Sequence, residues 1–242
     1  MSDFLALDTL VLDPRFNGPP GTANGGYACG AVGELVDGPA EVTLRTPPPL
    51  GVPLGVDFLP GGKIDVHDGD TLIMSARPVD GVDVEPPVRP TLAQAREAMR
   101  QHPGHGREGL LSACYVCGSR RHDGLGIHFG PLPGHPGVTA AVFIPDATVP
   151  SRGGDVAPDM VWAALDCPSY TPPLWDWNRP SLLARLAVER LDCIEVGEPV
   201  IATGWHIASE GRKHHTASAL LSPDGDILAR ASALWITLRS PR

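Results

Sequence analysis

The feature that most constrains the fold is a stretch of small residues between Thr22 and Val36. Asn24 suits the N-cap of a helix, and Gly38 suits the position just after its end. Glycine and alanine dominate the interior, and each glycine costs an isolated helix about 1 kcal/mol. Such a helix is stable only where other backbone packs very close to it. We expect a sheet curled around the helix to supply that contact.

A second stretch, from Asp159 to Pro168, predicts another central helix, because its Trp-Ala-Ala-Leu centre is apolar enough to be buried on most sides. Apolar runs between turn residues predict strands around both helices. The run 182–194 fits a long strand or, almost as well, a helix. The remaining predicted strands are 40–46, 52–59, 63–67, 71–79, 125–129, 138–144, 200–209, 215–221 and 227–238.

The chain repeats itself weakly. A Gly-x-Pro turn at Gly51 recurs at Gly197, and an Asp-Gly-Asp turn at Asp68 recurs at Asp224. Asp-Gly between apolar runs is a strong hairpin signal, so both halves follow the order helix, strand, turn, strand, turn, strand. We therefore predict two related domains, residues 8–80 and 109–242. The linker, 81–108, carries a short helix over 91–101 with Thr91 as its cap.

Composition limits the function classes. The 242 residues carry a net charge of −9, which argues against a nucleic-acid partner. No run of about 20 apolar residues predicts a membrane span, and the first residues do not form a signal peptide. Five scattered cysteines suit reduced thiols in the cytoplasm better than a disulfide framework.

These features, in this order, resemble the hotdog-fold acyl-CoA thioesterases, in particular the double-hotdog thioesterase-like proteins of actinobacteria. The resemblance implies an α+β fold in which antiparallel sheets each wrap a central helix, and it covers nearly the whole chain. The matching stretches are Phe16–Gly21 with Asn24–Tyr27, Cys114–Gly118 with Gly124–Gly126, Val161–Pro168, and Gly197–Pro199 through Trp235.

The resemblance also implies a mechanism. Such enzymes polarise a thioester carbonyl at a helix N-terminus, often with a His-Gly-Gly start, and use a carboxylate to activate water. Here Asn24 stands in the histidine position before Gly25 and Gly26, and Glu34 follows eight residues after Gly26. In the second half Asp166 follows Pro158 by eight, but Pro158 has no N–H to donate. One half could therefore supply the glycine amides and the other half Asp166.

Each of these residues also has a purely structural interpretation. Asn24 can serve only as an N-cap, Glu34 as a solvated helix residue, and Asp166 as a buried cap. A buried, unpaired aspartate is costly, which favours a functional role for Asp166.

Candidate substrate contacts are aromatic or basic. Tyr27 could bind a ligand carbonyl, and Trp162 and Tyr170 could line an acyl tunnel, although packing alone also explains them. Coenzyme A carries phosphates, and two basic clusters could hold them or could be solvated hairpin turns. These clusters contribute Arg120, Arg121, Arg212 and Lys213.

Cys114 and Cys117 form a Cys-x-x-Cys pair, but a single pair does not complete a tetrahedral zinc site. We expect no metal and no cofactor. The leading hypothesis is a thioesterase acting on an acyl-CoA or acyl-carrier-protein thioester. The alternative is a hotdog protein that binds such a thioester, or a hydrophobic small molecule, without catalysis. A hydratase ranks below both, because its Asp-x-Asn-Pro-x-His segment does not occur. A monomer and a homodimer of double-hotdog units both remain open.

Overall fold

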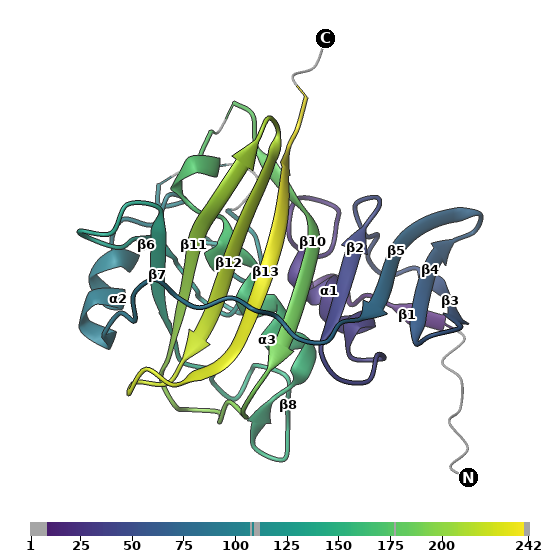
Figure 1. The fold of residues 1–242 in the computed structure, drawn as a ribbon, viewed down its shortest axis with the longest axis horizontal. Helices are drawn as coiled ribbons and strands as arrows, with labels where there is room; N and C mark the ends of the chain where they lie inside the picture. Colours follow the sequence, from purple (N-terminus) through teal and green to yellow (C-terminus); the bar gives the residue numbers. More distant parts are fainter. Residues whose placement is uncertain (1–8, 107, 109–111, 177, 240–242) are drawn as a thin grey trace.

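The computed structural model describes residues 9–106, 108, 112–176 and 178–239, so the predicted domain boundaries at residues 8, 109 and 242 lie outside it. The described chain forms an eleven-stranded antiparallel sheet in the order β1-β3-β4-β5-β2-β10-β13-β12-β11-β7-β6, with a separate β8–β9 hairpin (Figure 1). The α+β class with an antiparallel sheet is therefore confirmed. The two predicted halves share one sheet, because β2 pairs with β10.

The elements follow the predicted runs closely in most places. The helices are α1 (Gly25–Gly33), α2 (Leu92–Met99) and α3 (Pro158–Asp166). The strands are β1 (Thr9–Val11), β2 (Ala40–Leu44), β3 (Pro53–Leu59), β4 (Lys63–Asp68), β5 (Thr71–Pro78), β6 (Gly130–Pro131), β7 (Val138–Phe143), β8 (Ser151–Arg152), β9 (Asp155–Val156), β10 (Ser181–Arg190), β11 (Val200–Glu210), β12 (Lys213–Leu221) and β13 (Ile227–Thr237).

Helix α1 begins as predicted and ends early. The Asn24 side chain accepts a hydrogen bond from the Tyr27 N–H and caps the first turn. The helix ends at Gly33 rather than near Gly38, because the next residues form i to i−3 backbone hydrogen bonds, such as that from Val36 N–H to Gly33 O, in place of the α-helical pattern. Gly38 instead takes φ +78° in the turn that leads into β2.

The glycines of α1 face another helix. Gly26, Gly30 and Gly33 recur at a spacing that places them on one side of α1. A Cβ on Gly30 would lie 2.8 Å from the Asp159 Cα and 2.8 Å from the Trp162 Cβ, both in α3. The prediction that other backbone packs very close to α1 is confirmed. The prediction that the sheet supplies this contact is wrong for the glycine face, which packs against α3. Figure 1 shows α1 and α3 together behind the sheet, near the β2–β10 seam.

The predicted strand 125–129 is wrong. Its alternating side chains Leu125, Ile127 and Phe129 are buried, which produces the strand-like pattern. Its backbone, however, bonds to the turn before it, with Leu125 N–H donating to Tyr115 O and Ile127 N–H donating to Val116 O. The segment therefore packs a loop against the core and does not extend the sheet.

The linker crosses the opposite face of the sheet from α1 and α3, and ends in α2 beside β7 (Figure 1). Arg230 of β13 anchors it by donating to Val84 O and pairing with Glu85 at 3.1 Å. Thr91 and Gln94 form a capping box at the start of α2, as the sequence indicates. No helix in the described residues is long and apolar enough to cross a bilayer.

Candidate active site

A cavity of about 240 Å³ opens at the N-terminal end of α1. Its walls come from the segment before α1, the chain after β2, the start of β10 and the end of β13. Asp166 and three cysteines are also part of its lining, with Phe129 and Tyr170 beside them. The remaining lining residues are Gly18, Pro19, Thr22, Ala23, Asn24, Gly25, Leu44, Arg45, Thr46, Pro47, Pro48, Ser181, Leu182, Leu183, Ala184, Trp235, Ile236 and Leu238.

Asp166, the last residue of α3, is the central polar group of this pocket. It is 2% exposed. Its Oδ2 accepts hydrogen bonds from the Asn24 side-chain amide and from the Gly26 N–H, each at 2.9 Å. Its Oδ1 is buried and has no hydrogen-bond partner among the described residues. One carboxylate oxygen is thus held in place, while the other makes no hydrogen bond within the described chain.

Burial raises the pKa of Asp166 to about 7, against the opposing effect of the hydrogen bonds from Gly26 and Asn24. A carboxylate with a pKa in that range suits proton transfer near neutral pH.

The first turn of α1 leaves one backbone donor free. The Gly26 N–H is bound to Asp166, and the Tyr27 N–H is bound to the Asn24 side chain at 2.9 Å. The Gly25 N–H has no hydrogen-bond partner in the described chain, and Gly25 lines the pocket. A ligand oxygen in the pocket could therefore accept from Gly25 within the positive field of the helix N-terminus.

The end of α3 is supported from the sheet. The Ser169 hydroxyl donates to the Asp166 backbone carbonyl at 2.7 Å and accepts from the Trp235 Nε1–H at 2.9 Å. Ser218 of β12 donates to the Leu165 carbonyl at 2.6 Å. These bonds satisfy carbonyls that a helix end leaves free, so they hold the backbone from which the Asp166 side chain projects.

The structure places Glu34 outside the pocket lining. Its carboxylate accepts a hydrogen bond from Trp162 Nε1 at 2.8 Å and forms a two-pronged ion pair with Arg190 at 3.0 and 2.9 Å. All of its oxygens are therefore engaged in joining α1 to α3 and β10. The predicted pair of Asn24 and Asp166 is brought together, whereas Glu34 is not near them.

Of the three aromatic residues predicted to contact the substrate, one lines the pocket and two do not. Tyr170 lines the pocket. Tyr27 is not part of the lining, and its hydroxyl accepts a hydrogen bond from the Asp13 N–H at 3.2 Å. Trp162 is 2% exposed and packs on the glycine face of α1, where a Cβ on Gly33 would lie 2.5 Å from its ring.

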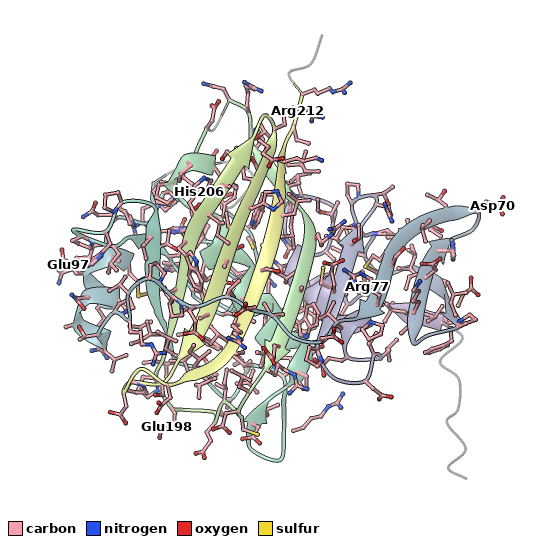
Figure 2. The ribbon with its side chains drawn as sticks, in the orientation of Figure 1. Asp70, Arg77, Glu97, Glu198, His206 and Arg212 are labelled. Atoms are coloured by element: carbon pink, nitrogen blue, oxygen red, sulfur yellow. The ribbon has the colours of Figure 1, made fainter. Side chains whose placement is uncertain are left out.

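The predicted basic clusters do not line the pocket. Arg121 binds Asn17, the Arg15 carbonyl and Asp123, and so ties the loop after Cys117 to the segment before α1. Arg120 pairs with Glu108. Figure 2 shows Arg212 at the tip of the β11–β12 hairpin, where it donates to the Thr237 carbonyl. Lys213 follows it and is exposed.

Sequence reasoning missed Arg45 and Thr46, which line the pocket after β2. Arg45 is exposed and forms no ion pair among the described residues, and the Thr46 hydroxyl is buried without a partner. The only local signal was the Pro47-Pro48-Pro49 run, which predicts an interruption of the strand. Cys167 was also missed, because it lies far from Cys114 and Cys117 in the sequence.

Solved structures share this architecture. A protein described as a thioesterase II from Thermobifida fusca matches with a TM-score of 0.64 at 16% identity, over 96% of this chain and 93% of that one. A TesB protein of Mycobacterium avium subspecies paratuberculosis matches with a TM-score of 0.60 at 12% identity, over 96% and 92%. A hotdog-fold protein of unknown function from Alicyclobacillus acidocaldarius gives 0.59 at 11% identity, over 97% and 93%.

The chain has the hotdog fold. The resemblance to hotdog thioesterase-like proteins is thereby confirmed at the level of structure. No family model and no curated protein matches the sequence. At sequence identities this low, the similarity shows that the fold is shared but does not show that the reactions are.

Proposed function

We propose that this hotdog protein is a thioesterase that hydrolyses an acyl-CoA or acyl-carrier-protein thioester in the pocket at the start of α1. The observation that carries the proposal is the Asp166 carboxylate. Asp166 lines the pocket; one of its oxygens is fixed by Asn24 and Gly26, and the other is buried and has no partner in the part of the chain that the structure describes. A buried polar atom without a partner is costly unless a ligand or reactant uses it.

In the proposed reaction Asp166 takes a proton from water as the water oxygen attacks the thioester carbonyl carbon. The Gly25 N–H stabilises the resulting oxyanion, with the positive end of α1 behind it. The carbon–sulfur bond then breaks, and the proton held by Asp166 goes to the leaving thiolate. The products are a carboxylic acid and a free thiol, and no covalent enzyme intermediate is needed.

The proposed substrate class follows from the pocket lining. Leucine, proline and aromatic side chains of the lining suit an acyl group, and Leu183 lies against the start of α1, 2.9 Å from where a Cβ on Gly25 would be. Arg45 is the basic side chain of the lining, so we assign it, rather than the predicted clusters, to the carrier's phosphates.

We also propose that the fold is a fused pair of hotdogs, with residues 8–80 and 109–242 as the two units and 81–108 as linker. The strand order supports this proposal. From the β2–β10 seam outward, one side reads β2, β5, β4, β3 and the other reads β10, β13, β12, β11. Corresponding strands occupy corresponding places, and α1 and α3 meet at the seam. A homodimer of these fused units and a cytoplasmic location remain predictions.

The test is release of free thiol from a panel of short, aryl and long acyl-CoAs, measured for wild type, Asp166→Asn and Asp159→Asn. Asp159 lies in the same helix and outside the pocket lining, so its variant controls for loss of a carboxylate in α3. We expect turnover to fall about 10²-fold or more in Asp166→Asn only, the range for losing a general base. Equal turnover in Asp166→Asn and wild type would refute the assignment.

A second candidate is a binding protein that holds a thioester without cleaving it. It is favoured by one specific observation: the first turn of α1 keeps a single free donor, because Asp166 and Asn24 occupy the next two N–H groups. Thermal stabilisation by an acyl-CoA without thiol release in wild type would support this alternative.

A further inference from the structure

Three cysteines from two distant segments meet at the inner wall of the pocket. Cys114 and Cys117 lie in the turn before the 125–129 loop, and Cys167 directly follows α3. Their sulfur atoms all lie within 4.8 Å of one another, and all three residues are buried. The Cys-x-x-Cys pair offers two thiols, too few for a zinc site, and the fold adds a third.

The spacing of the sulfurs matches a metal site. Tetrahedral zinc with sulfur ligands at about 2.3 Å holds two sulfurs about 3.8 Å apart. The Cys114 and Cys167 sulfurs are 3.9 Å apart. They are not joined as a disulfide; all three cysteines are free thiols.

The turn that carries the first pair is built to hold a sulfur in place. The Gly118 N–H donates to the Cys114 carbonyl at 2.8 Å, and a Cβ on Gly118 would lie 2.5 Å from that oxygen. This tight turn fixes the backbone that carries Cys114 and Cys117, the two neighbouring cysteines of the cluster.

A side-chain donor lies on the α1 side of the cluster. The Asn24 amide nitrogen is 3.8 Å from the Cys114 sulfur and 4.0 Å from the Cys167 sulfur. One hydrogen of this amide goes to Asp166 Oδ2, so the other can be shared by the two sulfurs. A polar donor at this distance suits sulfurs that carry negative charge, as metal-bound thiolates do.

We propose that Cys114, Cys117 and Cys167 bind a zinc ion whose fourth coordination position opens to the pocket. Thiolates are soft ligands that suit zinc, and binding releases the protons still held by the three thiols. All three residues line the pocket, and no fourth side-chain ligand belongs to the group in the described residues. Zinc sites with three protein ligands leave a position for water or substrate.

The ion would join the Cys114–Gly118 turn to the residue that follows Asp166. It would therefore position the α3 end independently of whether the pocket hydrolyses thioesters. The test reads metal content and spectra rather than turnover, so failure of the proposed thioesterase activity and failure of this proposal are distinguishable.

The protein is purified from cells grown with added zinc, under reducing conditions, and its metals are measured by mass spectrometry. We expect about one zinc per chain in wild type. We expect Cys114→Ser, Cys117→Ser and Cys167→Ser to lose it. Two control variants should keep it: Cys29→Ala, which removes a buried thiol outside the cluster, and Cys193→Ser, which removes an exposed one.

Cobalt provides a second measurement that does not depend on the variants folding. Wild-type apoprotein titrated with Co²⁺ should show a thiolate-to-cobalt charge-transfer band that saturates at about one equivalent and is abolished by added Zn²⁺. Absence of zinc in the purified protein together with no charge-transfer band would overturn the proposal. Zinc retained by a folded Cys167→Ser variant would overturn the assigned ligand set.

Discussion

Close packing of α1 on α3 makes Gly30 the sharpest test of the fold. A Cβ at this position would lie 2.8 Å from the Asp159 Cα, 2.8 Å from the Trp162 Cβ and 2.9 Å from the Asp159 carbonyl oxygen. Carbon atoms prefer separations of about 3.5–4.0 Å, so the Gly30→Ala variant must push the helices apart by most of an ångström. None of the three close atoms can move by a change of rotamer, because two are backbone and the position of a Cβ is fixed by its own backbone.

The net effect is a difference between two opposing contributions. Overpacking a well-filled core costs typically about 1–3 kcal/mol, and a clash with backbone belongs at the upper end of that range. Replacing glycine by alanine stabilises a helix by about 1 kcal/mol. We therefore expect Gly30→Ala to lower the free energy of unfolding by about 2 kcal/mol. The melting temperature of a chain of this length should fall by about 4–8 °C.

The assay is chemical and thermal denaturation of Gly30→Ala beside Gly55→Ala. Gly55 lies in β3, where an added Cβ would meet no atom of the described residues within 4 Å, so its variant should stay close to wild type. Gly30 is one turn from Gly26, so separation of the helices should also weaken the bond from the Gly26 N–H to Asp166 and reduce thiol release. If Gly30→Ala proved as stable as wild type, helix propensity would outweigh packing and the reasoning about α1 would fail.

Three single side chains give further tests. Burial lowers the pKa of His102 to about 4, whereas the value in the unfolded chain is near 6.5, so the unfolded chain binds more protons between these pH values. The contribution of His102 to the free energy of unfolding should therefore be about 3 kcal/mol smaller at pH 4 than above pH 6.5. The raised pKa of Asp166 acts in the opposite direction, so the measurement is the difference in pH slope between wild type and His102→Gln, in which the variant should lose less stability as the pH falls. An equal slope in the variant would contradict this. The Arg45→Ala variant should raise KM for an acyl-CoA and leave KM unchanged for a thioester without phosphates. Arg96→Ala, which changes an exposed residue of α2, is the control. An equal rise in KM for both substrates would exclude phosphate binding by Arg45. The Glu34→Gln variant should lower the free energy of unfolding by about 1–3 kcal/mol, because it weakens the bonds to Trp162 and Arg190. Thiol release per folded molecule should persist. Loss of turnover at unchanged stability would instead support the predicted catalytic role of Glu34.

Local signals in the sequence determined the elements of this protein. The Asn24 cap, the Thr91–Gln94 capping box and the Asp-Gly turns each depend on hydrogen bonds or dihedral angles within a few residues, so they can be predicted from neighbours alone. The strand pattern was also informative, except at 125–129. There the alternation of buried side chains was real, but the backbone partners belonged to a preceding turn rather than to a strand.

Only the tertiary structure decided which of these elements meet. The Gly26 N–H and the Asp166 carboxylate are 140 positions apart in the chain, and the approach of α1 to α3 brings them within 2.9 Å. The same approach places Cys167 beside Cys114 and commits Glu34 to Arg190. Residue types and spacing identify a candidate carboxylate, whereas its burial, its fixed oxygen and its free oxygen arise from packing between segments that no local pattern connects.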